Sequence, residues 1–219
     1  MESVSTYQKR LRALLSPEER QLFVSLKTPH KIQDYLDTLE INFEESGETT
    51  MSPRRVIRIG KAHCIEGALL AATSLAYHGS PPLLLDFQTL SIDEDHVIAV
   101  FKQDGLWGAI SKTNHAILRW RDPLYRSVRE LAMSYYHEYY MDDGRKTLAT
   151  FSRPFDLRRY APKRWVTAEE DLEWLCVDLD ESTHTPIAPR ALLRGTRPAS
   201  PIERELLNHR EWQKPESKR

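Results

Sequence analysis

Cys64 stands where its thiol can be activated. It lies just inside the start of an apolar, small-residue helix predicted over residues 64–77, which Gly79 ends. His96 follows further along the chain, at the start of a predicted strand. A helix N-terminus and a nearby imidazole both favour the thiolate, which is the nucleophilic form of cysteine. The two residues therefore predict a thiol nucleophile paired with a base.

The elements that must position this pair begin with helices. Residues 4–27 and 29–39 carry apolar side chains at the three-to-four spacing of amphipathic helices, and Ser16 divides the first of them. Residues 53–59 are expected to form a turn or a short helix. The glycine and alanine residues of segment 64–77 allow close approach of other backbone, which is typical of a central, buried helix.

Strands are predicted next along the chain. Residues 82–87 have the pattern of a short buried strand, and segments 96–102 and 106–111 flank Asp104-Gly105, a strong hairpin signal. In a hairpin with a two-residue turn, Ser111 lies opposite Ile98 and diagonal to His96 on the same face.

The rest of the chain is predicted more coarsely. We expect, in order, a helix over 123–140, a strand over 147–151, a helix over 165–175, an extended segment over 178–201, a short helix over 202–212 and a disordered tail over 213–219. Cys176 lies in an apolar stretch and is expected to be structural.

Composition excludes several classes of function. The chain has 219 residues, of which 40% are hydrophobic and 29% charged, as in ordinary globular proteins. Its 31 basic and 32 acidic residues nearly cancel, so we expect neither nucleic-acid nor membrane binding. No apolar run approaches the ~20 residues that span a bilayer, and the first residues lack signal-peptide features. Together with only two cysteines, this predicts a reduced, cytoplasmic setting.

Neither a metal nor a cofactor is predicted. The sequence contains no CxxC or HExxH spacing, so a zinc site has little support. His63, His96, His115 and His137 could gather around a metal only if the fold brought them together, since they lack paired spacing.

Three motifs in order resemble the transglutaminase-like branch of the papain-type fold. They are residues 63–68 (HCIEGA), 95–101 (DHVIAVF) and 104–109 (DGLWGA). The first motif alone is also similar to arylamine N-acetyltransferases. The resemblance covers roughly residues 55–115 and implies an α+β fold in which the cysteine helix packs on a small antiparallel sheet.

The resemblance also implies roles for residues. Cys64 would attack an amide or ester carbonyl, His96 would move the proton, and the start of the cysteine helix would supply an oxyanion hole. The family's third member is an aspartate on the next strand, where this sequence has Ser111. Asn114 is the alternative, because papain-type enzymes use an asparagine. Glu66 is expected to cap backbone or to pair with a basic side chain such as Arg58.

The expected organisation has four parts. Residues 1–50 form N-terminal helices, 51–160 the transglutaminase-like core, 161–212 a C-terminal extension that packs on the core, and 213–219 the tail. The sequence does not predict an oligomeric state.

The predicted function is thiol-dependent hydrolysis or acyl transfer at an amide or isopeptide bond. The reaction would pass through a Cys64 acyl-enzyme on a protein, peptide or small amide substrate, with His96 as acid and base. Two alternatives stay open: a catalytically inert binding or scaffold protein of the same fold, and an N-acyltransferase.

Overall fold

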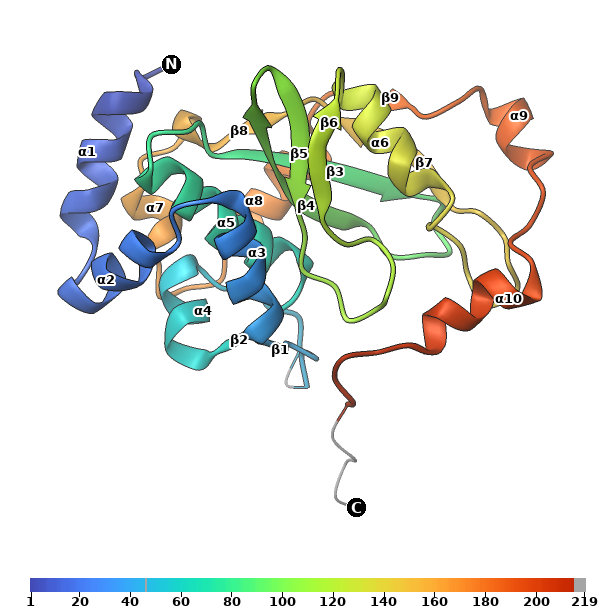
Figure 1. Ribbon diagram of the computed structural model, residues 1–219, viewed down its shortest axis with the longest axis horizontal. Helices are drawn as coiled ribbons and strands as arrows, with labels where there is room; N and C mark the ends of the chain where they lie inside the picture. Colours follow the sequence, from blue (N-terminus) through green and yellow to red (C-terminus); the bar gives the residue numbers. More distant parts are fainter. Residues whose placement is uncertain (46, 215–219) are drawn as a thin grey trace.

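A twisted antiparallel sheet crosses the middle of the protein, with helices on both of its faces (Figure 1). The computed structural model describes residues 1–45 and 47–214. The sheet has the strand order β6-β5-β4-β3-β7-β9, and β8 also pairs with β3. The strands are β3 (Leu83–Thr89), β4 (His96–Gln103), β5 (Leu106–Ile110), β6 (Arg121–Tyr125), β7 (Leu148–Ser152), β8 (Phe155–Asp156) and β9 (His184–Pro186).

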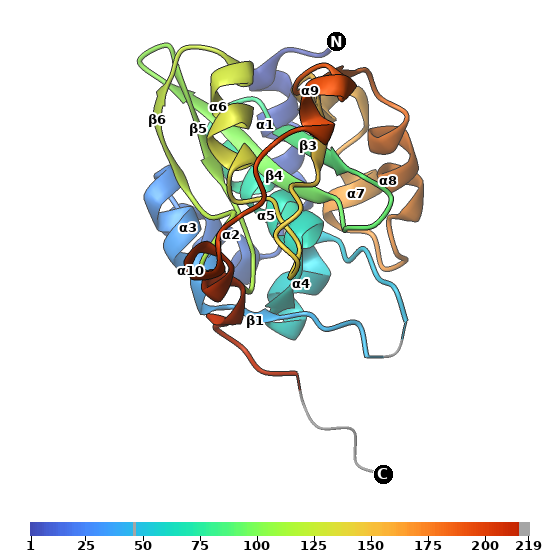
Figure 2. The ribbon, with the colours of Figure 1, turned by 90° about the vertical axis from the view of Figure 1, so that its right-hand side faces the viewer.

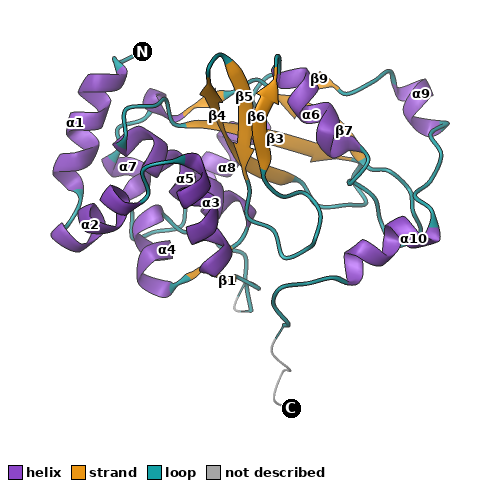
Figure 3. Cartoon of the chain, viewed as in Figure 1, coloured by secondary structure: helices purple, strands orange, loops and turns teal. Residues whose placement is uncertain are grey.

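Helices make up most of the remaining regular secondary structure (Figure 3). They are α1 (Val4–Leu14), α2 (Pro17–Ser25), α3 (Pro29–Thr38), α4 (Pro53–Ile59), α5 (Cys64–Tyr77), α6 (Val128–Tyr136), α7 (Lys163–Val166), α8 (Glu173–Asp180), α9 (Arg190–Arg194) and α10 (Pro201–Arg204), with 3-10 turns at Leu157–Arg159 and Glu205–Asn208. A separate two-stranded parallel ladder joins β1 (Glu40–Ile41) to β2 (Lys61–Ala62).

The cysteine helix α5 packs on one face of the sheet. Along β4 the side chains alternate, so Val97, Ala99 and Phe101 join the hydrophobic cluster that contains α5. Ile98 and Val100 join a second cluster with α6 on the opposite face. The predicted α+β class, with a buried cysteine helix on an antiparallel sheet, is therefore confirmed.

The hairpin that carries His96 has the predicted register. Asp104 and Gly105 adopt φ values of 51° and 83°, as a type I′ turn requires. Ala99 faces Ile110 across β4 and β5. Ser111 follows directly after β5, which places it on the His96 side of the hairpin.

Two helix predictions after this hairpin are confirmed only in part. Residues 121–125 of the segment around 123–140 form the edge strand β6, because Tyr125 pairs with Trp107 of β5, and Ser127 then caps α6. The predicted helix 165–175 is split into α7 and α8. In both places tertiary pairing or packing overrides a weak local helix preference.

The segment 178–201, which is expected to be extended, contains regular secondary structure. It supplies β9 to the edge of the sheet, and α8 extends to Asp180. The predicted helix 202–212 is limited to α10 and a 3-10 turn that ends at Asn208. Most of the predicted tail, residues 215–219, lies outside the described residues. Within the described chain, no helix is both long and apolar enough to cross a membrane.

Candidate active site

Cys64 is the first residue of α5, and the two residues before it are held by hydrogen bonds. The parallel ladder pairs Ile41 with Ala62 two residues upstream. His63 takes the N-cap position, and its backbone N–H donates to Glu66 at 3.0 Å. Such a carboxylate three residues into a helix stabilises the helix start.

Glu66 is fully buried and anchors the residues around the thiol. Its carboxylate accepts hydrogen bonds from Met51 N at 2.9 Å and from the side chains of Asn42 and Thr49 at 3.1 Å. The predicted backbone-capping role of Glu66 is confirmed. Arg58 pairs instead with Glu169.

Two imidazoles act on the Cys64 thiol. His63 Nδ1 lies 4.0 Å from the sulfur. His96 lines the same cavity and is the second group that lowers the pKa of the thiol. Burial alone raises the pKa of the thiol, but the hydrogen bonds and positive charges of both histidines outweigh burial and lower that pKa to about 5. The lowered pKa favours the thiolate form of Cys64 at neutral pH.

His96 is buried at the start of β4 and is oriented by Ser111. Its Nε2 lies 2.9 Å from Ser111 Oγ, which itself donates its proton to the carbonyl of Leu118 at 2.6 Å. Because the hydroxyl has a single proton, Nε2 of His96 is the donor in this contact. In the neutral ring, Nδ1 is then the basic nitrogen.

The loop that holds Ser111 is itself fixed. Gln33 of α3 bonds both backbone groups of Ser111, at 3.0 Å to its N–H and 2.9 Å to its carbonyl. Leu118 adopts φ 60°, an unusual value for a leucine, and its N–H donates to Glu138 at 2.7 Å. Glu138 is held in turn by Arg121 at 2.6 Å.

Asn114 points to a different partner. Its side-chain amide donates to the carbonyl of Trp212 at 3.0 Å and accepts from the N–H of the same residue at 2.9 Å. Among the described residues it makes no hydrogen bond to His96. The structure thus brings Cys64, His96 and Ser111 together, whereas Asn114 clamps the C-terminal segment, which we define as residues 205–214.

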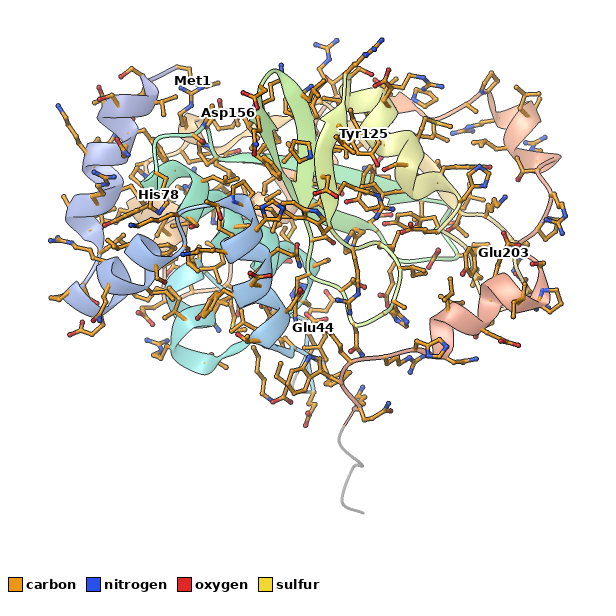
Figure 4. All side chains as sticks on the ribbon, in the orientation of Figure 1. Met1, Glu44, His78, Tyr125, Asp156 and Glu203 are labelled. Atoms are coloured by element: carbon orange, nitrogen blue, oxygen red, sulfur yellow. The ribbon has the colours of Figure 1, made fainter. Side chains whose placement is uncertain are left out.

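A cavity of about 490 Å³ opens beside the thiol. The loop after β1 forms one part of its wall, where Figure 4 labels Glu44, and the C-terminal segment forms another part as it descends from α10 (Figure 2). Leu207, Arg210 and Trp212 line the cavity together with Cys64 and His96. The C-terminal segment is therefore part of the site.

The cavity wall has charges of both signs. Its acidic residues are Glu44, Asp93, Glu94, Asp95 and Glu138, and its basic residues are Lys112, Arg210 and Lys214, alongside three histidines. Within the described part of the chain, no group of three or more histidine, cysteine, aspartate or glutamate side chains is arranged to hold a metal ion.

Sequence reasoning missed several residues of this site. The sequence predicts His63 only as a possible metal ligand, although its position next to Cys64 is a usable signal. Gln33, Glu138 and Trp212 come from distant parts of the chain, and no local pattern marks them. Tyr139 also lines the cavity; its hydroxyl is buried and has no hydrogen-bond partner among the described residues.

Comparison with known proteins finds similar solved structures but no sequence match. No protein-family model and no curated protein sequence matches the chain. Among solved structures, LapG of Legionella pneumophila overlaps half of it. The EGTA-treated form covers 51% of this chain and 71% of its own at 17% identity and a TM-score of 0.34. The calcium-bound form covers 50% and 71% at 18% identity and the same TM-score. The function is therefore argued below from this chain's own site.

Proposed function

We propose that this protein is a thiol-dependent hydrolase or acyltransferase that acts on an amide bond through a Cys64 acyl-enzyme. One observation carries the proposal: a half-buried thiol at a helix start lines one ligand-sized cavity together with an oriented histidine, His96, which lowers the pKa of the thiol. The order of motifs 63–68, 95–101 and 104–109, which resembles transglutaminase-like proteins, supports the same chemistry.

The reaction follows from the proton positions. The Cys64 thiolate attacks the amide carbonyl carbon and forms a carbon–sulfur bond. Protonated His96 gives its proton to the departing nitrogen as the carbon–nitrogen bond breaks, which leaves a thioester and a neutral imidazole. Water or an amine then attacks the thioester and gives a proton to His96. The carbon–sulfur bond breaks, and the thiolate and imidazolium are restored.

Backbone N–H groups at the start of α5 would stabilise the oxyanion of each tetrahedral intermediate. The first N–H groups of a helix have no partner within the helix. The substrate class that fits is a protein, peptide or small amide that places its carbonyl beside Cys64. Hydrolysis and acyl transfer differ only in whether water or an amine reaches the thioester.

Thiol labelling tests whether Cys64 is a nucleophile, and the second cysteine, Cys176, serves as the internal control. Iodoacetamide should label Cys64 at pH 6 at nearly its maximal rate, because a thiol with a pKa of about 5 is already ionised there. Cys176 should label far more slowly, because burial raises the pKa of its thiol. Peptide mass spectrometry after timed labelling measures both residues in one sample.

Activated esters and amides test the acyl-enzyme directly. A mass increase confined to Cys64, absent from Cys64→Ala, is the expected result. His96→Ala should slow formation or breakdown of the adduct by about 10²–10⁴-fold, the range for loss of general acid–base catalysis. Equal labelling of both cysteines together with no adduct would sink the enzyme proposal and favour an inert binding protein.

A further inference from the structure

His63 is surrounded by hydrogen-bond acceptors. Its Nε2 lies 2.9 Å from the carbonyl of Thr49, 3.4 Å from Glu66 and 3.6 Å from Glu44, and its Nδ1 faces the Cys64 sulfur at 4.0 Å. A neutral imidazole that donates from Nε2 to Thr49 has only a lone pair on Nδ1. It can accept from a thiol S–H, but it cannot donate to the thiolate that the lowered pKa of Cys64 favours. Only the imidazolium donates on both sides.

The two carboxylates make the positive charge favourable. Glu66 is fully buried, and its carboxylate accepts hydrogen bonds from Met51, Asn42, Thr49 and the backbone of His63. The half-buried Glu44 lies next to the same ring nitrogen. A cation at His63 thus compensates a buried negative charge that has no other cationic partner among the described residues.

His96 has different surroundings. Its Nε2 faces the neutral hydroxyl of Ser111, and within the described chain it forms no ion pair with a carboxylate. The two imidazoles on Cys64 are thus held in unlike environments.

We propose that His63 is a permanent imidazolium, supported by Glu66, that holds Cys64 as a thiolate, while His96 alone carries protons during turnover. This assignment rests on the proposed function, since it divides the work of that site between two histidines. It predicts that Cys64 stays ionised each time His96 loses its proton, because the His63 imidazolium remains beside the sulfur.

The charge balance around His63 is consistent with this assignment. Burial lowers the pKa of its imidazole, but the hydrogen bond and charge of Cys64, the charge of Glu66 and the hydrogen bond to Thr49 raise that pKa to about 10. The other ionisable groups that sense the thiolate are His96, Tyr139 and Cys176. Neither Tyr139 nor Cys176 is charged at neutral pH, since burial raises both of their pKa values.

Nuclear magnetic resonance of the histidine rings tests the charge directly. The chain has eight histidines, and the His63 signal is assigned by its loss in His63→Asn. We expect its ring carbon shift to stay at the protonated value from pH 6 to pH 8. In Cys64→Ala the same signal should titrate at a lower pH, because the coupling between thiolate and imidazolium is reciprocal.

The pH profile of Cys64 alkylation separates the two histidines. His63→Asn, which keeps a donor without a charge, should lower the rate at pH 6 at least ~10-fold and move the profile toward that of a free thiol. His96→Asn should leave most of the thiolate in place at pH 6 and abolish turnover of the acyl-enzyme. Circular dichroism and Cys176 labelling check that each variant remains folded.

The outcomes distinguish this inference from the proposed function. A neutral His63 at pH 7, or a His63→Asn profile identical to that of the unmodified protein, overturns the inference even if Cys64 forms an acyl adduct. A protonated His63 in a protein that never acylates supports the ion pair and rejects the proposed enzyme. If only His96→Asn raises the pKa of the thiol, His96 alone ionises it and the inference is wrong.

Discussion

The residue that orients His96 is a hydroxyl, where a carboxylate is expected in the resembling family. Ser111 Oγ accepts from His96 and donates to the Leu118 carbonyl, so it fixes the ring through a dipole and adds no negative charge. An aspartate there would stabilise the His96 imidazolium. Serine adds no such charge, and in the arrangement proposed above His63 supplies the positive charge beside the thiolate.

Ser111→Ala should therefore reduce turnover without abolishing the thiolate. Loss of a hydrogen bond to a charged group costs about 1.5–3 kcal/mol, equivalent to about 10–100-fold in rate. Steady-state kinetics and iodoacetamide labelling at pH 6 measure the two quantities separately. Ser152→Ala is the matched control, because Ser152 is equally buried in the same sheet but bonds the backbone of Asp86. Equal effects of both substitutions would refute an orienting role.

The close packing of α5 against the segment after β5 sets the geometry of the site. A Cβ added at Gly67 would lie 2.5 Å from Lys112 Cβ. Lys112 is buried and tied by its ammonium to the carbonyl of Leu39, so it has no room to withdraw. Glycine at this position lets the cysteine helix lie directly against the residue that follows Ser111.

Gly67→Ala should destabilise the protein although alanine is the better helix former. The helical gain is about 1 kcal/mol, and forced overpacking costs about 1–3 kcal/mol, so we expect the free energy of unfolding to fall by roughly 1 kcal/mol. Gly195→Ala is the control, since its nearest neighbour would be an ordinary contact at 3.7 Å. Urea unfolding compares the two variants, and no difference between them would contradict the packing argument.

At the scale of the molecule, the described C-terminal region folds back onto the candidate active site. The C-terminal segment, residues 205–214, reaches the cavity through backbone pairing of Ala116 with His209 and of Asn114 with Glu211. Arg119 adds an ion pair to Glu211 at 2.9 Å. Trp212, held by the Asn114 side chain, thus lines the same cavity as Cys64 even though their sequence positions are far apart.

Asn114→Ala should loosen this segment without unfolding the core. Each lost hydrogen bond is worth about 1 kcal/mol, so we expect hydrogen exchange at the Trp212 amide to accelerate about 10-fold or more. Asn208→Ala, on the same segment, is the control, because the Asn208 side chain makes no hydrogen bond among the described residues. Unchanged exchange at Trp212 would show that the Asn114 clamp contributes nothing.

Local sequence patterns predicted the elements and the central pair of residues. Helix α5 begins at Cys64 because Glu66 three positions into the helix caps its start, and Asp104-Gly105 sets the register that puts Ser111 on the His96 side. These features depend on side chains and backbone angles within a few residues, and a sequence displays such relations directly.

The remaining features depend on tertiary structure. Residues 121–125 form a strand because they pair with the edge of β5. Asn114 bonds Trp212 and not His96, because the C-terminal segment lies within hydrogen-bonding distance of its side chain. The charge state proposed for His63 depends on Glu44, Glu66 and Thr49 meeting around one ring. Only the folded structure determines contacts of this kind, because hydrogen bonding and burial act between groups that are near in space, whatever their separation in sequence.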